Sequence, residues 1–139
     1  MPAIGSATLP WRDEEAPFDA PAPSGGSPAG ALEAALRTCG LVCDRYMEAT
    51  RLVERRWTLP ILAALLAGPR RFSQIAEEVP GLSDRLLSLR LRDLARRGLV
   101  VREVEATTVP VRIRYRLSEK GYDLWRTVVD LHRWADRWL

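Results

Sequence analysis

The segment spanning residues 81–100, GLSDRLLSLRLRDLARRGLV, separates its leucines from its arginines when it is placed on a helix. At 100° per residue, Leu87, Leu91 and Leu94 fall within about 60° of each other, which is the apolar stripe of a helix packed on a core. The opposite face gathers arginines with few acids among them, whereas exposed faces normally mix the two signs. One face of this helix therefore has to pack, and the other is suited to a polyanion.

The segments before and after this helix define its place in an order of elements. A short helix is expected in RFSQIAEEVPG, with Ser73 as its N-cap and Pro80-Gly81 as its end. The leucine and arginine helix then starts after an N-cap at Ser83 and is terminated by Gly98. Two helices joined by a tight turn are thus predicted over residues 72–97.

A β-hairpin is expected directly after these two helices. In LVVREVEATTVPVRIRYRL the second half alternates strictly, which predicts a half-buried strand. Residues 99–105 are its partner strand and residues 106–110 the loop. One face of the second strand should carry the apolar residues Val111, Ile113, Tyr115 and Leu117, and the other Arg112, Arg114 and Arg116.

Further helices are expected on both sides of this region. ALEAALRTCGLVCDRYMEATRLVE predicts one helix with a break at Gly40 or two short helices, and RWTLPILAALLAGP predicts a helix with Pro60 in its first turn. Gly68-Pro69 ends that helix. SEKGYDLWRTVVDLHRWADRWL is expected as one final helix with apolar residues at helical spacing: Leu124, Val128, Leu131, Ala135 and Trp138.

The 139 residues are enough for one domain and an N-terminal tail. Residues 1–30 hold six prolines, four glycines and a net charge of −3, which predicts a disordered tail ahead of a folded domain at residues 31–139. The whole chain has a net charge of +3, so the predicted domain is distinctly basic. Such a charge favours an anionic partner.

The composition argues against an enzyme and against a membrane protein. Two cysteines and one histidine supply neither a nucleophile–base pair nor a set of metal ligands, so no catalytic residue, metal or cofactor is expected. No apolar run reaches the roughly 18 residues of a membrane span, and a secretory signal is lacking. We therefore expect a cytoplasmic protein without a membrane partner.

Helix, turn, helix and hairpin is the order of a winged helix-turn-helix, a mostly α fold with a β-hairpin wing. Its second helix enters the major groove of double-stranded DNA, which is the expected partner. Arg85 and Ser88 are then candidates for reading bases, while helix ends and wing arginines suit phosphates. The predicted DNA-binding residues are Arg71, Ser73, Ser83, Arg85, Ser88, Leu89, Arg92, Arg96 and Arg112.

The run RRWTLPILAALLAGPRRFSQIAEEVPGLSDRLLSLRLRDLARRGLVVREV, followed by VPVRIRYRLSEKG, resembles the HxlR-type winged-helix transcription regulators of bacteria, relatives of the MarR-type regulators. The likeness covers about residues 43–139. It implies a homodimer, mostly acting as a repressor, in which the first and last helices pair between subunits. Two recognition helices about 34 Å apart would read a pseudo-palindrome. The predicted interface residues are Leu124, Val128, Leu131, Ala135 and Trp138.

The resemblance also suggests what regulates the protein. In several members a cysteine near the start of the first helix senses oxidants, quinones or other electrophiles, which makes Cys43 and Cys39 candidates. On a continuous helix their Cβ atoms would lie roughly 5–6 Å apart, too far for an unstrained disulfide, so a bridge between subunits is easier to form. The alternative is that both are small buried residues.

Two questions stay open at the level of sequence. The tryptophans of the last helix either pack in a dimer or line a pocket for a planar small-molecule effector. The same fold also allows a sensor module that acts through protein partners and not through DNA. Strong salt dependence of DNA binding separates that alternative from a DNA-binding regulator.

Overall fold

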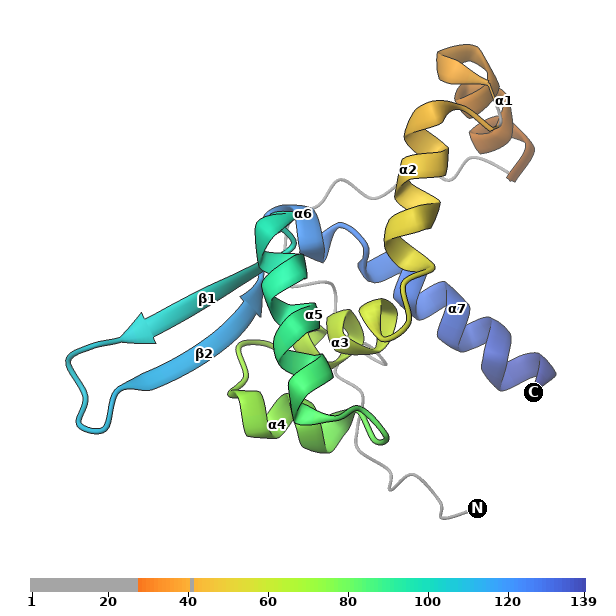
Figure 1. Cartoon of the computed structure of the whole chain (residues 1–139). Coiled ribbons are helices and arrows are strands. Elements are labelled where there is room, and N and C mark those ends of the chain that lie inside the picture. Colours follow the sequence, from red (N-terminus) through yellow and green to blue (C-terminus); the bar gives the residue numbers. More distant parts are fainter. Residues whose placement is uncertain (1–27, 41) are drawn as a thin grey trace. The chain divides into compact units, whose positions relative to one another are not determined.

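A computed structural model of the chain describes residues 28–40 and 42–139 (Figure 1). Nearly all of the predicted tail lies outside these residues. The chain divides into two units, residues 1–48 and 49–139. In the part that is described, no helix is long and apolar enough to cross a membrane.

The expected break at Gly40 is confirmed. The helix α1 (Pro28–Cys39) ends there and α2 (Asp44–Val53) follows, so the segment forms two short helices. Gly40 has a φ of 78°, in the left-handed region that glycine adopts without steric cost. Helix α1 begins within the segment that we predicted as a tail.

The second unit has the predicted order of helix, short helix, helix, hairpin and C-terminal helix. The hairpin extends away from the helices of this unit (Figure 1). The elements that follow α2 are α3 (Thr58–Leu66), α4 (Phe72–Glu78), α5 (Asp84–Arg96), β1 (Val100–Glu105), β2 (Arg112–Leu117), α6 (Glu119–Tyr122) and α7 (Trp125–Trp138).

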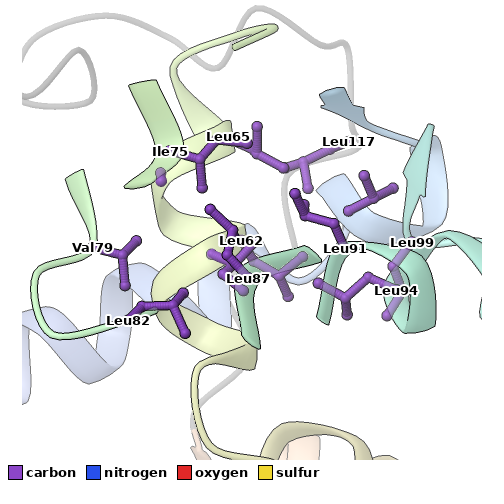
Figure 2. Close-up of a cluster of buried hydrophobic side chains, with 13 residues drawn as sticks. Leu62, Leu65, Ile75, Val79, Leu82, Leu87, Leu91, Leu94, Leu99 and Leu117 are labelled. Carbon is purple, nitrogen blue, oxygen red and sulfur yellow. The ribbon is translucent and has the colours of Figure 1, made fainter. Parts of the chain in front are cut away.

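The leucine stripe of α5 lies in the hydrophobic core, as predicted. Leu87, Leu91 and Leu94 are almost completely buried, and they pack with residues of α3 and α4 such as Leu62 and Ile75 (Figure 2). Because a helix buries only one stripe, this packing turns the arginine side of α5 away from the core. The core therefore sets the direction in which the cationic face points.

Both predicted ends of α5 are confirmed. The hydroxyl of Ser83 accepts a hydrogen bond from the backbone N–H of Leu86 at 3.3 Å, as an N-cap residue does. At the other end Gly98 has a φ of 72°, which lets the chain turn out of the helix and into β1. The wing therefore starts directly where the helix stops.

The wing is an antiparallel hairpin with a short addition that the sequence did not reveal. Val100 lies opposite Leu117, and Glu105 opposite Arg112. Arg70 joins the edge of β2: its N–H donates to the carbonyl of Tyr115 at 2.8 Å, and the N–H of Tyr115 donates back at 2.7 Å. This pair attaches the wing to the segment between α3 and α4.

The apolar face of the second strand is shorter than predicted. Ile113, Tyr115 and Leu117 are half-buried or buried, as expected. Val111 is 55% exposed and precedes β2, so its predicted place on the buried face is wrong. The reason is that the hairpin has left the core by this residue, and nothing covers its outer end among the described residues.

Ser73 is not the N-cap of α4, which corrects our prediction. Arg71 holds that position, and its backbone N–H donates to the Gln74 side chain at 2.9 Å. The glutamine side-chain oxygen thus accepts from the N–H of the N-cap residue, and the helix starts earlier than expected, at Phe72. Phe72 itself packs against the core.

The predicted single C-terminal helix is interrupted, which is a second correction. Helix α6 ends at Tyr122 and α7 begins at Trp125. Ser118 fixes α6, because its hydroxyl accepts from the Gly121 N–H at 3.0 Å and donates to the Gly98 carbonyl at 2.5 Å. These bonds hold α6 against the end of α5, and α7 then leaves as a separate helix that packs on α3.

Candidate nucleic-acid interface

The exposed face of α5 carries five of the predicted DNA-binding residues together. All five are exposed, and they lie opposite the buried leucines or, for Ser88, at the margin of that side: Arg85, Ser88, Leu89, Arg92 and Arg96. We refer to them as the α5 face. Ser83, the N-cap, is also exposed and lies at the start of the same helix. The structure thus brings these residues into one surface, because a three- or four-residue spacing repeats along one side of a helix.

The three arginines of the α5 face form no ion pair within the described residues, whereas other arginines of this unit do. Arg70 pairs with Glu78 at 3.1 Å, and Arg116 pairs with Glu103. The carboxylate of Asp93 in α5 forms ion pairs with Arg55, at 2.6 Å, and with Arg97, at 3.3 Å. Asp93 is therefore compensated by arginines outside the α5 face, and the three arginines of that face stay without an ion pair in the described residues.

The ion pairs of Asp93 also affect its protonation. Burial raises the pKa of this carboxyl, but the hydrogen bond from Arg55 and the charges of Arg97 and Arg55 outweigh that effect and lower the pKa below the ordinary 3.8. The sequence alone places Asp93 within a helix rich in arginine. Its pairing with Arg55 was missed because those residues lie 38 positions apart.

Two predicted phosphate contacts lie at the start of α4. Arg71 and Ser73 are exposed there, and the guanidinium of Arg71 forms no ion pair in the described part of the chain. Its neighbour Arg70 is instead paired with Glu78 and joined to β2 through its backbone. Of these two adjacent arginines, only Arg71 is left for an external anion.

Arg112 lies at the first position of β2, exposed and without an ion pair among the residues described. The loop before it is ordered by Thr108, whose hydroxyl lies 3.0 Å from the Glu105 carbonyl and 3.1 Å from the Pro110 carbonyl. Sequence reasoning missed Thr108, although a threonine within a turn is a common signal of such bonding. Arg112 thus lies on a wing whose loop is held by hydrogen bonds.

The predicted dimer residues do not share one environment. Val128 is buried within the chain itself, and Leu124 is partly buried against the hydrophobic core cluster. Leu131 and Trp138 are 49% and 62% exposed, and Ala135 between them is half-buried. Among the described residues, the stripe is therefore exposed only in its C-terminal half.

Cys43 is disulfide-bonded, while the side chain of Cys39 lies outside the described part of the structure. The distance that we expected between their Cβ atoms assumed one continuous helix. That assumption is wrong, because α1 ends at Cys39 and α2 begins at Asp44. In the described ranges, no three His, Cys, Asp or Glu residues come together as metal ligands.

A helix-turn-helix followed by an antiparallel hairpin defines a winged helix-turn-helix protein. The chain belongs to the HxlR-like helix-turn-helix family, whose model matches residues 52–139. It is 40% identical over 98 residues to the HTH-type transcriptional regulator YvaP of Bacillus subtilis, covering 70% of this chain and 90% of YvaP. The relatives of this chain are thus transcription regulators of the helix-turn-helix type.

Solved structures of two redox-related regulators are similar as well. The reduced form of YodB from B. subtilis matches with a TM-score of 0.63 and 34% identity, covering 70% of this chain and 95% of YodB. YodB has also been solved after diamide treatment and with bound quinone. The redox regulator HypR in its oxidised form matches with a TM-score of 0.63 and 27% identity, covering 67% of this chain and 95% of HypR.

Proposed function

We propose that this regulator is a homodimeric, sequence-specific DNA-binding repressor that inserts α5 into the major groove of a pseudo-palindromic operator. The observation that carries the proposal is the α5 face, whose arginines are exposed and unpaired among the described residues. Arg85 in the first turn faces base edges, and Arg92 and Arg96 contact phosphates. Guanidinium groups suit both partners because they donate in pairs.

The surroundings of α5 support this arrangement. Arg71 and Ser73 at the start of α4 offer phosphate contacts, and Arg112 on the wing offers another. Such contacts position the protein on DNA without reading sequence. Because the arginines lie on different elements, the rigid core is what sets their spacing.

The exposed part of α7 supports the dimer. Leu131 and Trp138 lie on one side of that helix with Ala135 between them, and they leave apolar surface in contact with water in the single chain. Covering this surface with the same helix of a second subunit would remove it from water. A dimer then presents two recognition helices to two half-sites.

We further propose that thiol oxidation or reaction with an electrophile controls DNA binding through Cys43. The support is the disulfide at Cys43 and the likeness to YodB and HypR, which are known in oxidised, diamide-treated or quinone-bound forms. A small aromatic effector bound in a pocket at the dimer interface, lined by Trp134 and Trp138, is the second candidate signal, since both rings are exposed in the single chain.

The test is a fluorescence anisotropy titration with a duplex selected from a randomised pool, at 50 and 200 mM salt and with reductant or diamide. Neutralising six or more phosphates predicts that affinity falls by roughly 10³-fold or more across this salt range. Loss of binding in diamide supports the cysteine as sensor, and binding that ignores diamide directs the search to an aromatic effector. The absence of salt-dependent binding to any selected duplex would favour the protein-partner alternative.

The Arg85→Ala variant extends this test to the role of α5. It is expected to cost about 1–3 kcal/mol of binding free energy at the operator and to relax the sequence preference. Arg133→Ala is the matched control, because Arg133 is exposed on α7 and pairs only with Asp130 at 3.4 Å. Equal affinity and preference for both variants would show that α5 does not read the bases.

A further inference from the structure

Leu89 is an apolar residue on an otherwise cationic surface. It is 50% exposed and belongs to the α5 face. It follows Arg85 by four residues and precedes Arg92 by three, so the three side chains are neighbours on one side of the helix. A leucine therefore lies near the middle of the surface that the proposed function places against base edges.

Leu89 does not pack in the hydrophobic core. The packing of α5 is supplied by Leu87, Leu91 and Leu94 on the opposite side, and Leu89 is absent from the core cluster. The other exposed large apolar residues of this unit lie on the wing, on α7 and at Leu139 after α7. In the described chain, Leu89 is the one exposed large apolar residue on α5, so its place on the α5 face calls for a specific partner.

We propose that Leu89 reads the 5-methyl group of a thymine in each operator half-site. This inference rests on the proposed function, because it requires α5 to lie in the major groove. Thymine is the standard base that shows an apolar group there, and leucine has no donor or acceptor for the other edges. Placing leucine against a polar base edge would instead remove water from groups that it cannot satisfy.

The geometry of α5 also fixes where this thymine should lie. Four residues of helix correspond to about 6 Å, and successive base pairs lie about 3.4 Å apart. The thymine read by Leu89 is therefore expected about two base pairs from the base read by Arg85. Arg85 thus selects its base by hydrogen bonds, whereas Leu89 selects thymine by burying one methyl group.

The experiment replaces each operator thymine by deoxyuridine, which keeps the base pairing and removes only the methyl group. Each substitution is made symmetrically in both half-sites, and the dissociation constant is measured by anisotropy under reductant. For the unmodified protein, one position per half-site is expected to bind roughly three- to tenfold more weakly, as the loss of a buried methyl group implies. Other thymines of the duplex serve as internal controls.

Three variants of Leu89 connect that loss to the side chain. Leu89→Ala and Leu89→Gln are expected to bind the thymine and deoxyuridine duplexes equally, while Leu89→Met should keep the preference for thymine. Because Leu89 is half-exposed and outside the core, all three should fold, which circular dichroism melting verifies.

The outcomes separate this inference from the function on which it rests. If salt-dependent binding is present but no deoxyuridine weakens it, or if the loss persists unchanged in Leu89→Ala, the role of Leu89 is wrong and the regulator assignment stands. If no selected duplex binds in a salt-dependent way, both proposals fail.

Discussion

At the scale of single residues, Gly121 is held where no side chain fits. A Cβ atom built on it would overlap the backbone carbonyl of Leu99, and rigid backbone cannot move aside as a flexible side chain does. Gly121→Ala is therefore expected to lower the free energy of unfolding by about 1–3 kcal/mol through overpacking. Urea unfolding followed by circular dichroism measures the change.

Glu119→Ala is the control for that variant, since Glu119 is an exposed residue of the same short helix α6. Its effect should stay within about 0.5 kcal/mol. If Gly121→Ala were as stable as Glu119→Ala, the close approach of α6 to the end of α5 would be contradicted.

At the scale of elements, Asp93 connects α5 to the turn before α3 through Arg55. Its side chain is 25% exposed and its pKa lies below 3.8 in the folded protein. A lowered pKa means that the carboxylate contributes stability above about pH 4, and that this contribution is lost as the pH falls through the folded value. Asp93→Asn is thus expected to cost about 1 kcal/mol at pH 7.

Urea unfolding at pH 7 and at pH 3 measures this contribution as the difference between the unmodified protein and the variant. The difference should shrink at the lower pH, because Asp93 is largely protonated in the unfolded chain at pH 3 and the folded carboxylate loses its advantage as the pH falls toward its lowered pKa. Asp130→Asn provides a matched comparison, because Asp130 pairs with Arg133 in an exposed position. A difference that stays constant with pH would show that the Asp93 charge is not what stabilises the fold.

Local periodicity explains which elements the sequence predicts. The leucine spacing of α5 and the alternation of β2 depend on side chains only a few positions apart, and both elements have the predicted type. The pairing of Arg70 with Tyr115 was missed, because it requires residues distant in sequence to meet. The split between α6 and α7 was missed for a related reason, since contacts with the end of α5 hold α6 in place.

At the scale of the whole molecule, the proposed dimer depends on the exposed stripe of α7. The double variant Leu131→Ala, Trp138→Ala removes apolar surface that a partner subunit would cover, so it should dissociate the protein. Sedimentation velocity is expected to show twice the 15.6 kDa chain mass for the unmodified protein and a single chain for the variant. Operator affinity should fall with it, because one subunit engages only one half-site.

Arg133→Ala, on the opposite side of α7, should leave the mass unchanged. An unmodified protein that sediments as a single chain while binding its operator would contradict the homodimer.

The sequence predicted only in part which residues of the apolar stripe on α7 are exposed. Helical spacing groups Val128 with Leu131, but the packing of α7 on α3 buries the first and leaves the second exposed.

The order of residues along the chain is enough to predict that α5 has an apolar and a cationic face, that a hairpin follows it, and that Ser83 and Gly98 mark its ends. These features follow from neighbours along the chain. Which arginines are neutralised depends on the folded arrangement, because a charge is compensated by the acid that the fold brings close to it. Asp93 is paired with Arg55 from 38 positions away, whereas the arginines of the α5 face form no ion pair within the described chain.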